Sequence, residues 1–317
     1  MGVVMHLVRT RIDRAALARL AARNGVLDDD LGYALHQALI ERLGPAEAPK
    51  PFRRLEPDAA TRRRLDPPAG VDRDGWDWLL AYAPDPSVLS GYKTAPPDPT
   101  GDWDRHTVVE TVLPEPFEVR SMPVECVGEA RRWSGADSLG FEVLVRPVRR
   151  LGPRARAARK ADDRNDGRKD GLGRPLRTGV EGQRGSVELD AFELARERFS
   201  RGDPDAPSRA SAYADWLAER LAPAAELERP ERDDALLHRF RRTRVVRAAA
   251  PRTAGEEAGA GRGRGGRGME QPEALMCGVL RVVDPQAFAA LLARGVGRHR
   301  AFGFGMVLLR PVGSERR

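Results

Sequence analysis

A tyrosine and a histidine three residues apart carry the side chains best suited to proton transfer in this sequence. Tyr33 and His36 lie in the stretch DLGYALHQALIERL, and side chains three apart on a helix project as neighbours. An ordinary imidazole pKa of about 6.5 lets His36 accept and donate protons at neutral pH, and Tyr33 can donate a hydrogen bond to a charged oxygen beside it. The alternative is an ordinary histidine at the boundary of the core, which is the more common situation on a single helix.

A second candidate is the glycine-rich stretch ARGVGRHRAFGFGMVLLRP near the C-terminus. Its four glycines surround two arginines and a histidine: Gly295, Gly297, Gly303 and Gly305 around Arg298, His299 and Arg300. Glycine permits positive φ and close backbone approach, so successive N–H groups can converge on a phosphate while arginines neutralise its charge. The stretch follows a predicted helix and lacks a GK[ST] sequence, which distinguishes it from Walker and dinucleotide-binding loops. A helix-to-strand turn explains Gly295 alone, so we predict a phosphate-binding loop over 295–305.

Other kinds of site find no support in the sequence. No HExxH, GxSxG or paired-carboxylate motif is present, and Cys126 and Cys277 do not have the spacing of metal ligands. We therefore expect no metal and no cofactor, so any catalysis should be acid-base chemistry. No apolar run approaches the roughly 20 residues of a membrane span, and the stretch MGVVMHLVRT lacks the long apolar region of a signal peptide. A cytoplasmic protein with no membrane partner is expected.

The basic charge of the chain is unevenly distributed. The 317 residues carry a net charge of +7, and only four of the 54 basic side chains are lysine. Three windows, 146–177, 239–267 and 294–317, carry +8, +7 and +5, which leaves −13 for the rest of the chain. A GC-rich genome can produce an arginine-rich composition, but it does not explain this segregation. Because arginine grips phosphate bidentately and stacks on unpaired bases, the pattern indicates a polyanionic partner.

Patterns in the first half put the Tyr33 and His36 pair on a helix. Leucines recur every four residues from Leu31 to Leu43, and Gly44-Pro45 ends the helix, so His36 falls at the margin of the apolar stripe. Short strands are predicted over 3–8, 51–55, 76–82 and 117–123, with a weak helix near 87–92. The resulting order, β-α-β-β-α-β, is that of a ferredoxin-like unit.

The second half repeats this order. Strands are predicted over 140–148, 240–246, 276–283 and 304–309, and helices over 211–221 and 286–294. Asp284 and Pro285 form an N-cap and N1 pair for the last helix, and Gly295 ends it. We therefore predict an α+β protein of two tandem ferredoxin-like (RRM-like) domains, residues 1–135 and 138–317. Arginine- and glycine-rich segments near 151–187 and 250–270 are predicted to be insertions in the second domain.

Several segments resemble those of one known family and follow its order. These are YALHQALIERLG with KPFRRL, then LGFEVLVRPVRR, AYADWLAERL, FRRTRVVR, MCGVLRVVDPQAFAALLARGVG and finally GVGRHRAFGFGMVLLRP. Together they resemble the CRISPR repeat-processing endoribonucleases, in particular the CasE (Cse3) group of the type I-E Cascade system. The resemblance covers most of the chain outside roughly 57–112, 151–187 and 250–270. The glycine-rich motif is highly specific, whereas Tyr33-x-x-His36 is a short match on the expected first helix.

This resemblance implies a metal-independent endoribonuclease that cuts precursor CRISPR RNA within the repeat, at the base of its hairpin. The ribose 2′-OH would attack the adjacent phosphate and leave a 2′,3′-cyclic phosphate and a 5′-OH, and the mature crRNA would enter Cascade. His36 matches the general acid or base and Tyr33 the tyrosine that assists it, while no lysine or arginine is matched as the electrostatic partner of His36. RNA contacts are expected from Arg149, Arg150 and the glycine-rich loop.

Two other functions are compatible with the same residues. A non-catalytic RRM-like subunit of a CRISPR or other ribonucleoprotein complex would keep the fold and the loop but only bind RNA. A generic arginine-rich nucleic-acid binder would bind unrelated hairpins equally well at fixed salt. Tyr33 and His36 favour the enzyme, whose expected partners are the CRISPR repeat RNA hairpin and other Cascade subunits.

Overall fold

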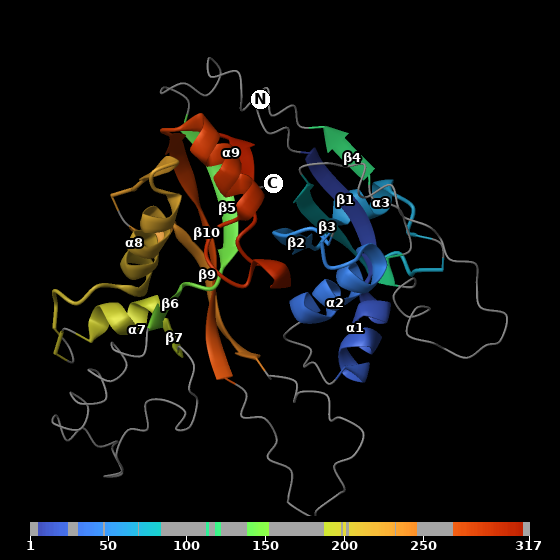
Figure 1. The fold of residues 1–317 in the computed structure, drawn as a ribbon, viewed down its shortest axis with the longest axis horizontal. Coiled ribbons are helices and arrows are strands. Elements are labelled where there is room, and N and C mark those ends of the chain that lie inside the picture. Colours follow the sequence, from blue (N-terminus) through green and yellow to red (C-terminus); the bar gives the residue numbers. More distant parts are fainter. Residues whose placement is uncertain are drawn as a thin grey trace, which may run out of the picture.

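The part of the chain that the computed structural model describes contains two main antiparallel sheets with helices packed on them, and a small two-stranded sheet (Figure 1). The structure describes residues 6–24, 31–46, 48–68, 70–83, 112–113, 118–121, 138–151, 187–197, 199–200, 203–231, 233–245 and 269–312. One main sheet is built from residues 6–121 and the other from residues 138–311. The predicted boundary between domains 1–135 and 138–317 lies outside the described residues, as do most of the predicted insertions and the weak helix near 87–92.

The first unit has the strand order of a ferredoxin-like fold. Its elements are β1 (His6–Asp13), α1 (Arg14–Arg23), α2 (Leu31–Leu43), β2 (Phe52–Leu55), α3 (Ala59–Arg64), β3 (Trp76–Ala83) and β4 (Glu118–Ser121). The sheet order is β2-β3-β1-β4, and all neighbouring strands are antiparallel. Helices α1 and α2 share a core with Val8 and Ile12 of β1, which fixes them on one face of this sheet.

The second unit repeats the order. Its main elements are β5 (Ser138–Val145), α8 (Arg209–Leu221), β8 (Ala225–Glu228), β10 (Met269–Val282), α9 (Pro285–Arg294) and β11 (Val307–Pro311). The sheet order is β11-β5-β10-β8, again antiparallel throughout, and β9 (Leu237–Val245) pairs with the first part of the long β10. Smaller elements are β6 (Val148–Leu151), β7 (Val187–Asp190), α7 (Ala191–Arg196) and the 3-10 turns η3 (Asp233–Ala235) and η4 (Arg300–Phe302). The prediction of two tandem ferredoxin-like units is confirmed.

Local signals explain the helices that position the site. Helix α2 buries alanines and leucines on one stripe, namely Ala34, Leu35, Ala38, Leu39 and Leu43, so Tyr33 and His36 lie half-buried beside it. Asp284 caps α9 by accepting hydrogen bonds from the N–H groups of the second and third residues of the helix. Gly295 follows the helix with a φ of 76°, as the predicted stop requires.

Three predictions about elements were wrong or incomplete. Helix α1 was not predicted, although Asp13 caps it and Leu17 and Leu20 are buried. The first strand was predicted over 3–8, but the pairing with β3 runs from His6 to Asp13. The single strand predicted over 140–148 is two strands. The strand is interrupted at Arg146-Pro147, and β6 then pairs with β7 in a separate two-stranded sheet.

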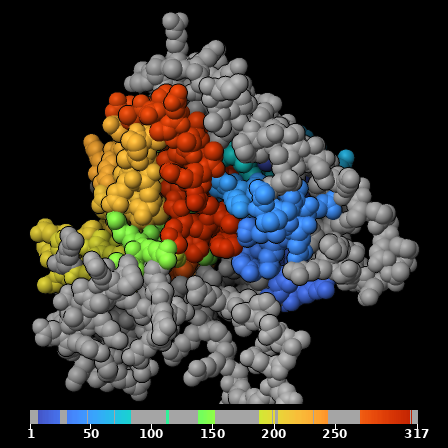
Figure 2. All heavy atoms as spheres, viewed as in Figure 1, coloured from blue at the N-terminus to red at the C-terminus, as the bar shows by residue number. Residues whose placement is uncertain are grey.

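The two units are in direct contact. The Tyr82 hydroxyl of β3 donates to the Val307 carbonyl of β11 at 2.8 Å, and Arg53 of β2 pairs with Glu142 of β5 at 3.3 Å. Figure 2 shows the red C-terminal segment lying directly against the blue N-terminal helices. At Gly32 the approach is closest, because a Cβ there would lie 2.1 Å from the Phe302 carbonyl oxygen. A glycine at position 32 therefore lets η4 sit against the start of α2.

Candidate functional site

Phe302 joins the two regions that the sequence analysis treated separately. Its ring lies 5.6 Å from the Tyr33 ring and 5.4 Å from the His36 ring, centroid to centroid, and meets His36 edge-on at 81°. The 3-10 turn that carries Phe302 belongs to the glycine-rich loop, whereas Tyr33 and His36 belong to α2. The proposed proton-transfer pair and the proposed phosphate-binding loop therefore form one site. Phe302 stands inside the predicted loop, but nothing in its sequence context indicated this contact.

His36 is held in a form suited to exchange a proton. Burial, and then the positive charge of Lys50, lower the pKa of His36 below its ordinary value of 6.5. Its Nδ1 atom is buried and has no hydrogen-bond partner among the described residues. The imidazole is therefore neutral at neutral pH, and one of its ring nitrogens has no hydrogen bond to the described residues. Lys50 is a cation that the sequence analysis did not assign to His36.

The backbone of the glycine-rich loop is folded tightly on itself. Gly305 has a φ of 79°, and a Cβ there would lie 2.2 Å from the Val296 carbonyl oxygen. The Val296 N–H donates to the Gly305 carbonyl at 2.8 Å, and the Gly305 N–H donates to the Leu144 carbonyl of β5 at 2.7 Å. Gly297, with a φ of 75°, approaches the Trp216 ring so closely that a Cβ would lie 2.8 Å from it. These contacts fix the loop between β5 and α8.

A glutamate holds the centre of the loop. Glu188 of β7 lies 2.8 Å from Nε2 of His299 and 2.5 Å from Nε of Arg298. The hydrogen bond from His299, together with the charges of His299 and Arg298, lowers the pKa of Glu188 from 4.5 to about 2. His299 itself has a left-handed backbone, with a φ of 60°. Glu188 was not predicted, because its partner residues are distant in the sequence.

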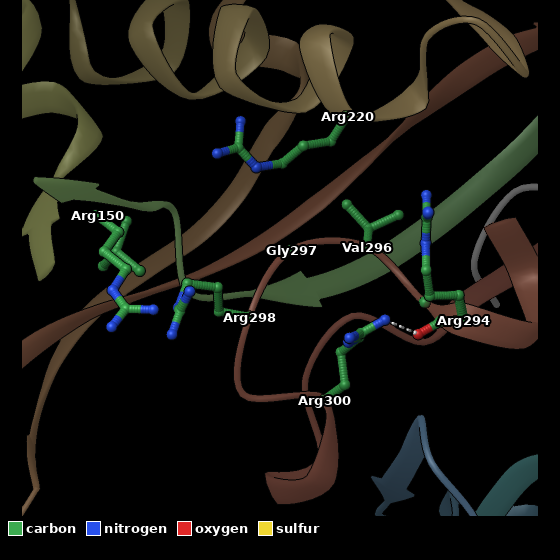
Figure 3. Close-up of a pocket in the computed structure, with 9 residues that line it drawn as sticks. Arg150, Arg220, Arg294, Val296, Gly297, Arg298 and Arg300 are labelled. Carbon is green, nitrogen blue, oxygen red and sulfur yellow. Dashed lines mark hydrogen bonds between the residues drawn. The ribbon is translucent and has the colours of Figure 1, made fainter. Parts of the chain in front are cut away.

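Five arginines line a pocket of about 330 Å³ beside this loop (Figure 3). The lining residues are Val148, Arg150, Arg220, Arg294, Gly295, Val296, Gly297, Arg298 and Arg300. Burial, and then the charges of Arg294 and Arg298, lower the pKa of Arg300; burial and Arg149 do the same to the pKa of Arg220. Mutual repulsion of this kind is relieved when an anion binds between the cations.

The predicted site residues divide between the two sides of the loop. Arg150, Gly295, Gly297, Arg298 and Arg300 line the pocket. Arg149 instead pairs with Glu219 at 2.5 Å, and His299 faces Glu188. Gly303 and Gly305 shape the loop backbone without lining the pocket. Arg220 and Arg294 line it although the sequence analysis did not select them, because a single arginine on a helix carries no signal for a shared pocket.

The described residues also lack the features of a metal site and of a membrane span. Among them, no group of three or more histidine, cysteine or carboxylate side chains has the arrangement of a metal site. Within the same described ranges, no helix is both long and apolar enough to span a membrane.

Fold and site together define a protein of two ferredoxin-like units that meet at a histidine and an arginine-lined loop. A family model described as "CRISPR associated protein" matches residues 106–311, which is more than half of the chain. The chain therefore belongs to the CRISPR associated protein family. No curated protein sequence matches it.

Solved structures with a similar chain path include two of the protein Cse3. The structure titled CRISPR endoribonuclease Cse3 bound to 19 nt RNA is 20% identical, with a TM-score of 0.46, covering 96% of this chain and 100% of that one. Thermus thermophilus Cse3, bound to an RNA representing a pre-cleavage complex, is 18% identical, with a TM-score of 0.44 and coverage of 97% and 100%. The CRISPR-associated protein Cas6e from Escherichia coli K-12 is 15% identical, with a TM-score of 0.40 and coverage of 97% and 100%.

Proposed function

We propose that this protein is a metal-independent endoribonuclease that binds precursor CRISPR RNA and cleaves it within the repeat, at the base of the repeat hairpin. The observation that carries the proposal is the contact of Phe302 with both Tyr33 and His36. Through it, a neutral histidine lies beside a loop rich in arginine. Membership of the CRISPR associated protein family supports a CRISPR RNA as the substrate.

RNA supplies its own nucleophile for this reaction, so the protein needs only to position the RNA and to handle protons and charge. The ribose 2′-oxygen would attack the adjacent phosphorus while the bond from phosphorus to the 5′-oxygen breaks. The products are a 2′,3′-cyclic phosphate and a 5′-OH, and the mature crRNA would pass to Cascade.

The 2′-OH loses a proton and the leaving 5′-oxygen gains one; His36 would carry one of these two transfers and water the other. The depressed pKa of His36 favours the neutral form, which can accept a proton on its unprotonated ring nitrogen. Tyr33 would donate a hydrogen bond to the charged phosphate oxygens, and Lys50 would stabilise the same negative charge. Because all three groups are protein side chains, cleavage should continue in EDTA.

The test is cleavage of the repeat RNA of a CRISPR array from the same genome, with EDTA present. We expect His36→Ala to bind this RNA with wild-type affinity and to leave it uncut. His238→Ala is the matched control, because His238 is exposed on β9 and outside the site. Undiminished cutting by His36→Ala would overturn the catalytic role. If the wild-type protein itself bound the RNA but did not cut it, the result would favour a non-catalytic RNA-binding subunit.

A further inference from the structure

The arginine pocket is assembled from four parts of the second unit. Arg150 comes from β6, Arg220 from α8 and Arg294 from the end of α9, while Arg298 and Arg300 come from the glycine-rich loop. In Figure 3, Arg220 descends from the helix above the loop, Arg150 and Arg298 lie on one side and Arg294 lies on the other. The lining set contains no carboxylate. Such convergence of guanidinium groups is suited to an anion with several oxygens.

Two of the arginines, Arg220 and Arg300, are held by contacts within the protein. Arg220 stacks on the Trp216 ring at 4.1 Å and donates to the Trp216 carbonyl at 2.9 Å, and the Trp216 indole donates to the Val148 carbonyl at 3.1 Å. Arg300 donates to the Arg294 carbonyl at 2.7 Å. Groups held in this way lose little conformational entropy when they bind a ligand, so the pocket is a preorganised site rather than a loose basic surface.

Nearby glutamates compensate only part of the positive charge. Glu188 forms an ion pair with Nε of Arg298, and Glu219 forms one with Arg220 at 3.5 Å. Arg294 is exposed, and its guanidinium makes no hydrogen bond to any described residue. Counted over the described residues, the pocket therefore keeps an excess of positive charge, and Arg294 is available to a ligand.

The pocket shares no lining residue with the ring cluster around His36. Phe302 contacts Tyr33 and His36, whereas the lining of the pocket runs from Gly295 to Arg300 and includes no residue of α2. One loop therefore faces two places at which a phosphate could sit. A volume of about 330 Å³ is at the lower end of pockets that take small ligands, which allows a phosphate with its sugar.

We propose that the pocket binds an internal phosphodiester of the RNA other than the one that is cleaved, and that Arg220 and Arg294 are RNA-binding residues that hold this phosphate. The proposal rests on the proposed function for the identity of the RNA. Bound there, the second phosphate would set the register of the RNA, so that the scissile phosphate arrives beside His36. Arg220 offers a planar fork for bidentate contact, and Arg294 adds charge at the mouth of the site.

The experiment compares two pocket variants with a matched control on one non-cleavable substrate. The substrate is the repeat RNA with a 2′-deoxy residue at the cleavage position. Arg294→Gln removes an exposed charge, and Arg220→Lys keeps the charge but removes the fork. Arg281→Gln is the control, because Arg281 is exposed on β10, pairs with Glu226 and does not line the pocket.

We expect Arg294→Gln and Arg220→Lys each to weaken binding about tenfold, as the loss of a charge-assisted hydrogen bond does. The slope of log affinity against log salt should fall by about one for Arg294→Gln. The Arg281→Gln control should stay within about twofold of wild type. If Arg294→Gln and the control bound equally well and the wild type still cleaved, the role of the pocket would be overturned and the proposed function would stand. If the wild type bound the RNA through the pocket but never cut it, the proposed function would be overturned and the role of the pocket would stand.

Single methylphosphonate substitutions in the RNA then identify the phosphate. A substitution at one internal position should weaken binding by the wild type, and its effect on Arg294→Gln should be at least fivefold smaller. The reason is that the RNA substitution and the protein substitution remove the same contact. If this coupling fell on the scissile phosphate, the pocket would be part of the cleavage site and the proposal would be wrong. A final measurement uses inorganic phosphate as the probe. Suppose that phosphate raises the Tm of wild type but not of Arg294→Gln, and that the substitution leaves the RNA affinity unchanged. The pocket would then be a site for free phosphate, and the proposal would be wrong.

Discussion

Replacement of Glu188 by glutamine tests how the glycine-rich loop is held. The substitution keeps the size of the side chain and removes the charge that faces His299 at 2.8 Å and Arg298 at 2.5 Å. The gap between the ordinary pKa of 4.5 and the pKa of about 2 in the folded protein corresponds to about 3 kcal/mol in favour of the ionised carboxylate. Solvent screening reduces this figure, because the Arg298 side chain is 45% exposed, so we expect Glu188→Gln to cost about 2 kcal/mol.

This contribution depends on pH in a defined direction. Because folding depresses the pKa of Glu188, the stabilisation is complete above the unfolded-state value of 4.5 and is lost as the pH falls toward about 2. The difference in free energy of unfolding between wild type and Glu188→Gln should therefore shrink by roughly 40% between pH 7 and pH 3.5.

Urea unfolding at these two pH values measures the difference directly. Glu226→Gln is the matched control, because Glu226 also pairs with an arginine but is 61% exposed, and it should cost less than about 0.5 kcal/mol at either pH. A cost for Glu188→Gln no larger than that of the control, or a cost independent of pH, would refute the assignment of Glu188 as the anchor of the loop.

Three further substitutions test the other contacts of the site. Phe302→Ala removes the ring that joins His36 to the loop, so single-turnover cleavage should fall by about 10²-fold while RNA affinity changes less than about threefold; equal losses in both would contradict a positioning role. Lys50→Gln removes a positive charge that lowers the pKa of His36, so this pKa, followed by NMR, should rise, and an unchanged titration would exclude Lys50 as its electrostatic partner. Gly305→Ala puts a Cβ 2.2 Å from the Val296 carbonyl oxygen at positive φ and should destabilise the protein by at least about 2 kcal/mol in urea unfolding. Gly44→Ala, at a φ of 87° with open space around it, is its control and should cost only about 1 kcal/mol.

Helices with strong end signals were predicted well from the sequence. Residues 31–43 were predicted to be helical and to end before Gly44-Pro45, as the structure shows, because the leucine repeat and Gly44-Pro45 both act locally. The cap at Asp284 and the stop at Gly295 are local in the same sense. Helix α1 was missed because its apolar side is built from alanines as much as leucines, which makes the amphipathic pattern weak.

Features that depend on distant pairing were not predictable in this way. Strands β6 and β7 pair although a long arginine-rich segment separates them, and each is only four residues long. The contact of Glu188 with His299 follows from that pairing, and the contact of Phe302 with His36 follows from the docking of the two units. The two halves of the site were therefore predictable from the sequence, but the residues that join them were not.

The most direct test of the proposed reaction is the chemistry of the RNA ends. Wild-type protein in EDTA should cut its repeat RNA once, leaving a 2′,3′-cyclic phosphate and a 5′-OH, and a single 2′-deoxy substitution at the cut position should abolish the reaction. Cleavage of the deoxy-substituted RNA, or products with a 5′-phosphate, would contradict attack by the 2′-OH and with it the role assigned to His36.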